Sequence, residues 1–260
     1  MSDPHRLHID DTDVAFYREQ GYFIYQHSLF PEDRFRALQS FFEKLLAELP
    51  EGKRPESMDV PHFNHPELFD WLLADEVLDF VERFIGSDIA LWASHFICKP
   101  PKTGQRVPWH EDSAYWGERL SEHEVLTIWL AIDDSNRENG CMRAVAGSHD
   151  NGFSDYEDVA NPEVHVFGNE IVAEQVDESR IVDLEVKAGQ CHIHHSRIVH
   201  GSQRNTSGRR RCGYTMRYMP TRVKMIQAPG RPRHQIYLAR GQDLGGNEYG
   251  EPGVFFDRGV

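Results

Sequence analysis

The sequence predicts a mainly β fold, a sandwich or jelly roll, that is buttressed by helices near the N-terminus. In the first third of the chain, apolar residues recur at three- and four-residue intervals, as in amphipathic helices. From Ile89 onward the apolar runs are short and are separated by glycine-containing turns. Many short strands at such spacing favour a sandwich or jelly roll over an alternating α/β fold.

Four helical runs are predicted before the first long strand. They cover residues 10–21, a stretch that begins at Pro31, residues 67–73 and residues 76–85. Gly21 suits the left-handed end of the first helix, and Pro31 suits the first turn of the second. We expect these helices to support a sheet rather than to carry chemistry.

The strands follow in a regular series. They are predicted over residues 22–25, 89–99, 125–132, 141–145, 181–186, 191–194 and 212–218. The turn over 133–140 ends in Asn139-Gly140, a dipeptide that is favoured in hairpins. The polar stretch 150–178 shows little periodicity and suits a long loop or lid over one end of a barrel.

The chain is expected to form a single domain over residues 1–260, because 260 residues can bury one substantial core. Within it we expect a mainly helical buttress over 1–87, a jelly-roll core over 88–220 and a Gly/Pro-rich C-terminal tail over 221–260.

Composition excludes several classes of protein. A net charge of −14 and a pI near 5.5 disfavour nonspecific binding to nucleic acid or to anionic membranes. No run of 18 apolar residues occurs and no export signal is evident, so we expect a soluble, cytoplasmic protein. The four cysteines lie far apart without a CxxC spacing, which predicts reduced core thiols rather than disulfides or a zinc site.

The candidate chemistry centres on residues 108–116, which read PWHEDSAYW. If this segment is extended, His110 and Asp112 leave the same face and Glu111 leaves the other. Two such ligands and a second histidine from elsewhere make a 2-His-1-carboxylate triad, which leaves three positions of octahedral Fe(II) open. His200, within HHSRIVHGSQRN, is the candidate third ligand.

The residues after His200 suit a ligand site. Gly201, directly after it, is small enough to leave room for a ligand at a metal ion; Ser202 comes next, and three arginines follow at 209–211. An arginine on the next strand can clamp a carboxylate through two hydrogen bonds, which lysine does less well. A solvated basic turn beside a buried histidine is the alternative interpretation.

Three blocks between Val14 and Tyr218 resemble the signature blocks of a known family. The blocks are LWASHFICKPPKTGQRVPWHEDSAYW, TIWLAIDDSNRENGCMRAVAGSH and HHSRIVHGSQRNTSGRRRCGYTMRY. They are similar to those of the phytanoyl-CoA dioxygenase family of Fe(II)- and 2-oxoglutarate-dependent oxygenases. The resemblance implies a double-stranded β-helix of cupin-like type, with Fe(II), 2-oxoglutarate and O2 as cofactor and cosubstrates.

Site residues follow from this resemblance, position by position. It implies that His110, Asp112 and His200 are the iron ligands. Arg211, eleven positions after His200, would hold the far carboxylate of 2-oxoglutarate, and Ser202 would assist it.

The resemblance also bears on residues around the cosubstrate. Trp129 matches an aromatic residue that lines the pocket, and His95 matches a further cosubstrate contact of variable type. Lys99 opens the family's Lys-Pro-Pro turn and is expected to be structural. The residues expected at the open end of the barrel, in contact with substrate, are Ser113, Tyr115 and Trp116.

Other histidines are weaker ligand candidates. No Gly-Ser pair, like the one after His200, follows His192, His194 or His195. We interpret these three as pocket lining or core. The N-terminal histidines have no strand context and are expected at the surface: His5, His8, His62 and His65.

The arginines leave alternatives open. Arg209 or Arg210 could replace Arg211 if the turn differs, although strand alternation sends Arg210 to the opposite face. Three further arginines are possible anchors for an anionic substrate, with solvation at the surface as the preferred interpretation: Arg143, Arg217 and Arg222.

The implied reaction couples decarboxylation of 2-oxoglutarate to hydroxylation of a substrate C–H bond, with release of succinate and CO2. Asp112 favours hydroxylation, since related halogenases lack this carboxylate. The absence of an extended basic patch predicts a small polar metabolite as substrate rather than a fatty acyl-CoA. Two alternatives are a non-catalytic or non-redox cupin-like protein that binds a metal or small acid, and a lyase or isomerase, in which Arg211 and Ser202 would lack a purpose.

Overall fold

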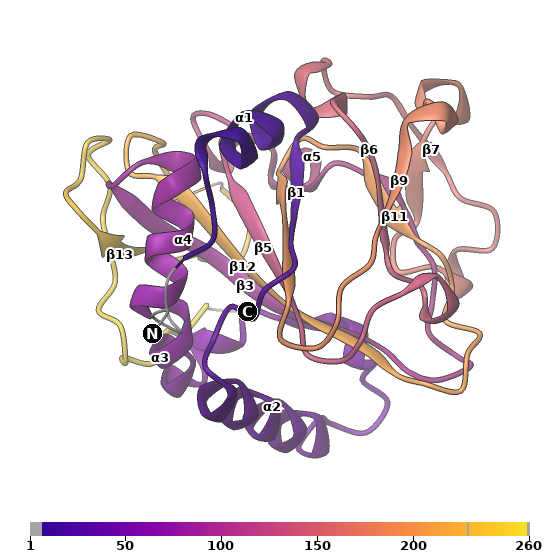
Figure 1. The fold of residues 1–260 in the computed structure, drawn as a ribbon, viewed down its shortest axis with the longest axis horizontal. Coiled ribbons are helices and arrows are strands. Elements are labelled where there is room, and N and C mark those ends of the chain that lie inside the picture. The colour runs from indigo at the N-terminus through magenta and orange to yellow at the C-terminus, as the bar shows by residue number, and fades with distance from the viewer. Residues whose placement is uncertain (1–6, 228, 259–260) are drawn as a thin grey trace.

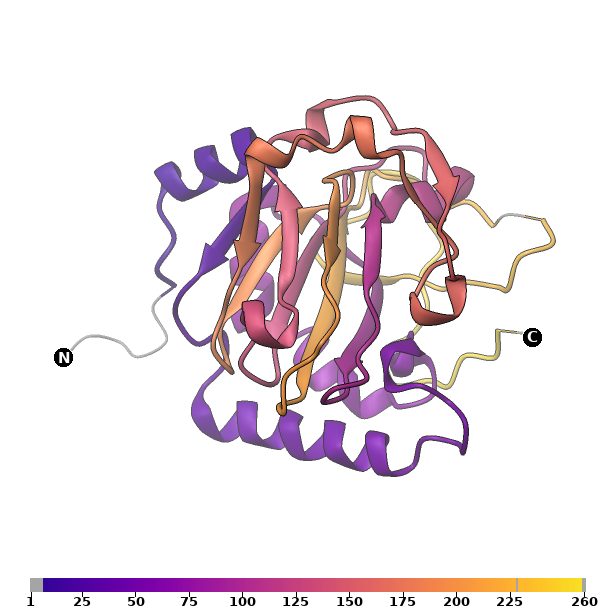
Figure 2. The same ribbon diagram turned by 90° about the vertical axis from the view of Figure 1, so that its right-hand side faces the viewer.

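Two antiparallel sheets face one another in the computed structural model, which describes residues 7–227 and 229–258 (Figures 1 and 2). In spatial order the larger sheet consists of β1 (Tyr22–Tyr25), β10 (Cys191–His195), β5 (Leu126–Ala131), β12 (Arg211–Pro220), β3 (Ile89–Lys99) and β13 (Tyr237–Arg240), with β2 (Met58–Asp59) also paired to β3. The smaller sheet consists of β4 (Val107–His110), β11 (His200–Ser202), β6 (Met142–Val145) and β9 (Ile181–Leu184). These facing sheets form a jelly roll, so the predicted fold class is confirmed.

Helices cover the outer face of the larger sheet (Figures 1 and 2). They are α1 (Asp11–Gln20), α2 (Glu32–Ala47), α3 (Phe69–Leu72) and α4 (Asp75–Ile85). From α2, Phe42 packs on Phe96 of β3, with ring centroids 5.1 Å apart. From α4, Phe80 packs on Tyr25 of β1 at the same separation. The main apolar core therefore lies between the helices and the outer face, and the inner face is left for the site.

Gly21 ends α1 in the left-handed region, at φ 75°, as predicted. Its backbone N–H donates to the carbonyl oxygen of Tyr17. A Cβ at this position would lie 2.5 Å from Nδ1 of the buried His149, so glycine also permits close packing on the jelly roll.

The prediction of a hairpin at Asn139-Gly140 is wrong. The strands that flank this turn, β5 and β6, lie in different sheets, and the chain crosses from one sheet to the other. The Asn139 side chain is buried, accepts from the backbone N–H of Asn136, and donates to the carbonyl oxygen of Asp134. The dipeptide thus stabilises a turn between sheets.

The stretch 150–178 contains a two-stranded ribbon, β7 (Tyr156–Asp158) and β8 (Asn169–Ile171). The Gly/Pro-rich tail adds β13 to the edge of β3. None of the described helices combines the length and apolarity that a bilayer crossing needs. The four cysteines are buried and unpaired, as predicted.

The N-terminal histidines do not all lie at the surface. His62 is wholly buried, with Nδ1 2.7 Å from Oγ of Ser94, and its predicted surface position is wrong. The short 3-10 turn Pro61–Phe63 carries it against the aromatic ring of Tyr237 in the tail strand, a contact between distant segments. His8 is exposed, His65 is half-buried, and His5 lies outside the described residues.

Truncation of Phe42 tests how α2 is held on the sheet. Phe42→Ala should lower the free energy of unfolding by about 3–5 kcal/mol, because it leaves a cavity in a fully buried contact. Urea denaturation followed by circular dichroism measures this loss. Phe16→Ala, at a side chain that is 41% exposed, is the control and should change stability by less than about 1 kcal/mol. Equal effects would contradict the assignment of α2 to the core.

Candidate metal centre and active site

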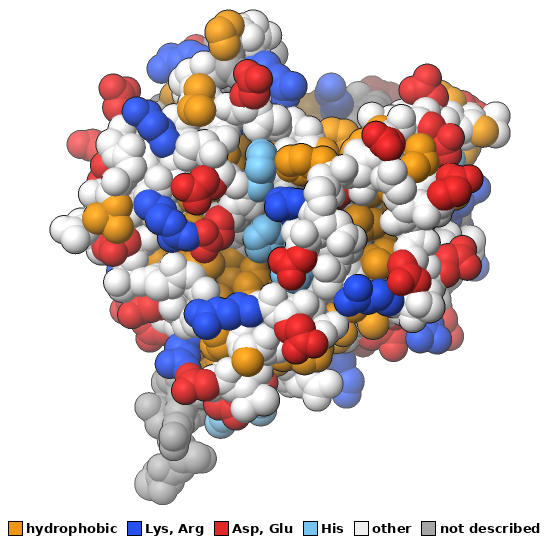
Figure 3. All heavy atoms as spheres, turned by 90° about the horizontal axis from the view of Figure 1, so that it is seen from above, with side chains coloured by type: hydrophobic (Ala, Val, Ile, Leu, Met, Phe, Trp, Pro, Cys, Tyr) orange, Lys and Arg blue, Asp and Glu red, His pale blue; other side chains and the backbone are white. Residues whose placement is uncertain are grey.

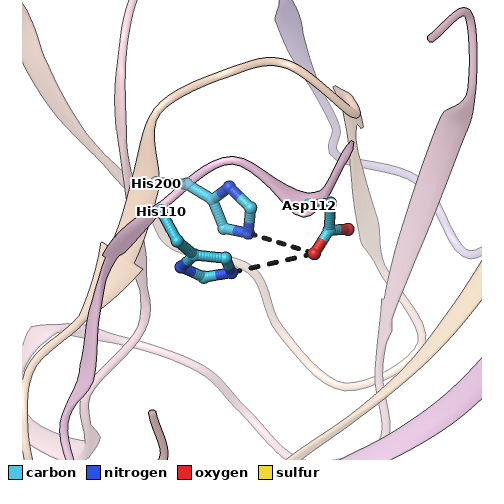
Figure 4. A group of neighbouring side chains, drawn as sticks. All are labelled: His110, Asp112 and His200. Atoms are coloured by element: carbon cyan, nitrogen blue, oxygen red, sulfur yellow. Dashed lines mark ion pairs between the residues drawn. The ribbon is translucent and has the colours of Figure 1, made fainter. Parts of the chain in front are cut away.

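Three side chains converge between the two sheets: His110, Asp112 and His200 (Figure 4). The Nε2 atoms of His110 and His200 lie 3.7 Å and 3.9 Å from Oδ1 of Asp112. All three residues are buried, and their possible ligand atoms lie within 4.8 Å of one another. The geometry places two imidazole nitrogens and one carboxylate oxygen within reach of a single ion.

The backbone that carries this group differs from the expected single strand. β4 ends at His110, and Asp112 is the first residue of the short helix α5 (Asp112–Trp116). Glu111 retains an extended conformation as the N-cap, so Asp112 still turns towards His110. Glu111 faces the other way, and its carboxylate accepts hydrogen bonds from Ser154 and Tyr156.

Pairing of β4 with β11 sets His200 directly opposite His110. Nδ1 of His110 donates to the carbonyl oxygen of Pro108 at 2.8 Å, and Nδ1 of His200 donates to that of Ile198 at 3.0 Å. These bonds fix one tautomer and leave each Nε2 with a free lone pair towards Asp112. Burial, and next the neighbouring His110, hold the pKa of His200 well below its usual value, which favours the neutral ring that a metal needs.

Arg217 holds the other oxygen of the Asp112 carboxylate. Its Nε lies 3.2 Å from Oδ2, and Nε2 of His194 lies 3.9 Å from the same oxygen. Burial by itself raises the pKa of Asp112, but Arg217 and the surrounding histidines together hold that pKa well below its usual range. The carboxylate is therefore ionised, with Oδ1 turned towards the two imidazoles. The preferred interpretation of Arg217 as a solvated surface residue is wrong, because β12 carries it into the interior.

The triad lines a cavity between the inner faces of the two sheets. Its empty volume, including open solvent at its mouth, is about 630 Å³. Of the residues predicted for the cosubstrate, four line this same cavity: His95, Trp129, Ser202 and Arg211. Tertiary structure thus gathers them from β3, β5, β11 and β12.

Arg211 is buried at one end of the cavity. Its Cζ lies 4.5 Å from the Trp129 ring centroid, and its Nε lies 3.5 Å from Oγ of Ser135. Burial lowers the pKa of Arg211 to about 10, so the guanidinium is still charged at neutral pH. Among the described residues, no carboxylate lies within ion-pair distance of it.

Trp129 reaches Arg211 because residue 213 has no side chain. A Cβ on Gly213 would lie 2.1 Å from Cζ2 of Trp129. On β10, His192 stacks on the same indole at 5.2 Å and 2°. A glycine two residues after an arginine on the same strand face is the sequence signal that could have revealed this close approach.

The rival arginines lie elsewhere. Arg210 pairs with Asp133 and Glu43, on the opposite face from Arg211, as strand alternation predicted. Arg209 is exposed and pairs with Glu138.

The residues expected to contact substrate divide into two groups. Ser113 is turned away from the cavity, and its hydroxyl donates to the carbonyl oxygen of Ser196. Tyr115 packs on Phe167, a cavity-lining residue, with ring centroids 4.8 Å apart. Trp116 packs against Arg217, 5.8 Å from Cζ to the ring centroid. These two aromatic residues therefore support the wall of the cavity.

Sequence reasoning did not identify several cavity residues. Phe167 comes from the aperiodic stretch 150–178, and its ring lies 4.9 Å from that of His110. Glu56 comes from a polar connector and pairs with Arg54. Thr215 shares the inner face of β12 with Arg211, so alternation along that strand could have revealed it.

Lys99 has the structural role that was expected for it. It is fully buried, and its Nζ donates to the backbone carbonyl oxygens of Ser202 and Gln203, where β11 ends. His194 lines the cavity, whereas His192 is buried behind it against Trp129.

Comparison with known proteins identifies the family. The model of the family described as Phytanoyl-CoA dioxygenase (PhyH) matches residues 17–213. The chain belongs to the PhyH family. This PhyH-family protein is 29% identical over 155 residues to a probable alpha-ketoglutarate-dependent hypophosphite dioxygenase of Stutzerimonas stutzeri, a match that covers 59% of the chain but only about half, 53%, of that relative.

Two further similarities cover more of the chain. Peroxisomal phytanoyl-CoA dioxygenase of Rattus norvegicus is 23% identical over 248 residues, which are 85% of this chain and 71% of that protein. The crystal structure of the non-heme alpha ketoglutarate dependent carbocyclase SnoK, from nogalamycin biosynthesis, superposes with a TM-score of 0.70. It is 26% identical, and the match covers 86% of this chain and 89% of that one. The family expected from the sequence is confirmed.

Removal of one imidazole tests the three-residue metal centre. His200→Ala should weaken divalent-metal binding by roughly 100-fold or more. Even the mutation of residues that only support a metal ligand typically lowers metal affinity about 10–100-fold. Calorimetric titration with Co(II) under anaerobic conditions measures the change. His27→Ala, at an exposed histidine, is the control and should bind Co(II) as the wild type does. Equal affinity in both variants would exclude His200 as a ligand.

Proposed function

We propose that this PhyH-family protein is an Fe(II)- and 2-oxoglutarate-dependent dioxygenase that hydroxylates a C–H bond of a small polar metabolite. The balanced reaction converts substrate, 2-oxoglutarate and O2 into hydroxylated substrate, succinate and CO2. The observation that carries the proposal is the convergence of His110, Asp112 and His200 in a buried cavity that also contains Arg211. Family membership and the activities after which the relatives are named support it.

The donor set fits Fe(II). Two neutral imidazole nitrogens and one ionised carboxylate oxygen are the ligands of non-heme Fe(II) oxygenases, and they leave positions open for other ligands. His110, Asp112 and His200 would hold the ion. The Nδ1 hydrogen bonds and the Arg217 contact fix the orientation of the ligands before a metal binds.

Arg211 and Ser202 fit the far carboxylate of 2-oxoglutarate. A buried guanidinium without a carboxylate partner is costly, and an incoming dianion would remove this cost. Its planar fork suits two parallel hydrogen bonds to a carboxylate. Trp129 provides an apolar wall beside it, and His95 is a further candidate contact.

When bound, Fe(II), 2-oxoglutarate and O2 supply the oxidising chemistry, and the chain supplies orientation and exclusion of water. Phe167 and Val166 lie in the loop that joins β7 to β8, and both line the cavity. Asp112 is ionised, and both ligand imidazoles turn Nε2 rather than Nδ1 towards it.

The size of the cavity and the charge pattern of the surface support a small polar substrate. About 630 Å³, including the opening, must hold both cosubstrate and substrate. On the face in Figure 3, Lys and Arg side chains alternate with Asp and Glu, and no extended basic patch that suits the phosphates of CoA is seen there. The relative named as a hypophosphite dioxygenase acts, by its name, on a small molecule.

Cosubstrate binding can be tested without turnover. Anaerobic addition of Fe(II) and 2-oxoglutarate to the protein should produce a weak visible charge-transfer band. Arg211→Lys should raise the Kd for 2-oxoglutarate about tenfold or more, because lysine cannot form the paired hydrogen bonds. Arg210→Lys, on the opposite strand face, is the matched control and should leave the Kd unchanged. A protein that binds metal without producing this band would instead be the non-redox cupin-like alternative.

A substrate screen that follows O2-dependent succinate formation tests the reaction. Small amino-acid-like or phosphonate-like compounds should stimulate succinate formation more than phytanoyl-CoA does. Asp112→Ala should abolish this stimulation, and Asp158→Ala, at an exposed carboxylate, should retain it. Faster turnover of phytanoyl-CoA would refute the substrate class, and activity retained by Asp112→Ala would refute the ligand assignment.

A further inference from the structure

The cavity contains a second buried arginine, Arg217, which the proposed binding of metal and cosubstrate does not place against a ligand of its own. Arg211, Gly213, Thr215 and Arg217 alternate along β12 and share its inner face. Six residues of extended chain separate the backbones of the two arginines by about 20 Å. One cation therefore lies at each end of this strand face, and Asp112 contacts the second.

The contacts of Arg217 leave part of its guanidinium free. Nε donates to Oδ2 of Asp112 at 3.2 Å, and Nη1 donates to Oγ1 of Thr215 at 3.0 Å. A guanidinium has five N–H donors, and the described residues provide no acceptor for Nη2. The residue is only 8% exposed, so the unused donors face a largely enclosed space.

The balance of charges in the cavity also favours an anionic ligand beside Arg217. A divalent ion and a dianionic cosubstrate would cancel, and Asp112 cancels one of the two arginines. Glu56, the other acid of the lining, is already paired with Arg54. One positive charge would remain in a buried space, where an unbalanced charge is costly. A monoanionic group beside Arg217 would neutralise it.

The other arginines considered as anchors lie outside the cavity. Arg143 contacts Asp183 and lies over the Trp109 ring. Arg222 is exposed and forms an ion pair with Glu124. Neither lines the cavity, which leaves Arg217 as the arginine placed next to the candidate metal centre.

From this geometry we infer that Arg217 binds an oxyanion of the substrate, a carboxylate or phosphonate, next to the metal centre. The inference rests on the proposed function and narrows it, since the substrate is then a small organic acid. Trp116 forms part of the same subsite by packing against the Arg217 guanidinium.

The test compares acids with their neutral analogues under anaerobic conditions. Protein loaded with Fe(II) and 2-oxoglutarate is titrated with short carboxylic acids, short alkylphosphonates and the primary amides of the same carboxylic acids, and shifts of the charge-transfer band are recorded. The acids should shift the band at concentrations about tenfold or more below those of the amides. Arg217→Gln should remove this preference, Arg217→Lys should retain it with weaker affinity, and Arg222→Gln, the matched control, should leave it unchanged.

Three outcomes would overturn the inference: amides as effective as acids, no shift with any compound, or an unchanged preference in Arg217→Gln. If Arg217→Gln does not form the band at all, the affinity of Arg217→Lys for acids is the deciding measurement. Undiminished affinity in that variant would show that Arg217 only positions Asp112. The band before any acid is added reports the proposed function separately. Its absence in the wild type would remove both proposals, whereas a band that forms and ignores the acids would remove only this one.

Discussion

The antiparallel pairing of β4 with β11 is the constraint on which the candidate site depends. It sets His110 opposite His200, with ring centroids 4.0 Å apart. Each ring is oriented by its own chain, through an Nδ1 hydrogen bond to the carbonyl oxygen two residues earlier. These hydrogen bonds thus orient each imidazole, and the strand pairing brings the two imidazoles close together. A shift of register by one residue would turn one histidine to the other face.

Asp112 adds a dependence on the larger sheet. The turn from β4 into α5 brings its carboxylate to the two imidazoles, but Arg217 on β12 holds the second oxygen. The three proposed ligands come from the smaller sheet and the turn that follows β4. The orientation of one of them nevertheless depends on the larger sheet, which carries Arg217. The helices on the outer face, with contacts such as Phe42 on Phe96, keep the larger sheet in position.

Three buried basic side chains around the cavity differ in their hydrogen-bond partners. Lys99 donates to backbone carbonyl oxygens at the end of β11, and Arg217 pairs with Asp112. Arg211 has an aromatic face and a serine hydroxyl but no described carboxylate partner. Since a buried charge without a counter-charge is costly, Arg211 favours an incoming anion, and Arg217, although paired with Asp112, keeps unused donors for another.

Much of the fold was predictable because the apolar periodicity is strong. The strand over 89–99 and the helix end at Gly21 were predicted correctly, since each depends on neighbouring residues. The hairpin at Asn139-Gly140 was not, because the same dipeptide serves a hairpin and a crossing between sheets, and only the partners of the flanking strands distinguish them. His62 was misplaced for a similar reason, as the strand that buries it lies about 175 residues further along the chain.

The sequence by itself determined the types of residue available to the site: the His-x-Asp pair, the histidine followed by Gly-Ser, and the alternation that separates Arg211 from Arg210. These features are local, because spacing along one segment decides which face a side chain takes. Only the tertiary structure decided that Arg217 is buried against Asp112, that Phe167 reaches His110 from the stretch 150–178, and that Ser113 turns away. Those placements depend on which segments pack together, and contacts between distant parts of the chain leave no periodic trace in the sequence.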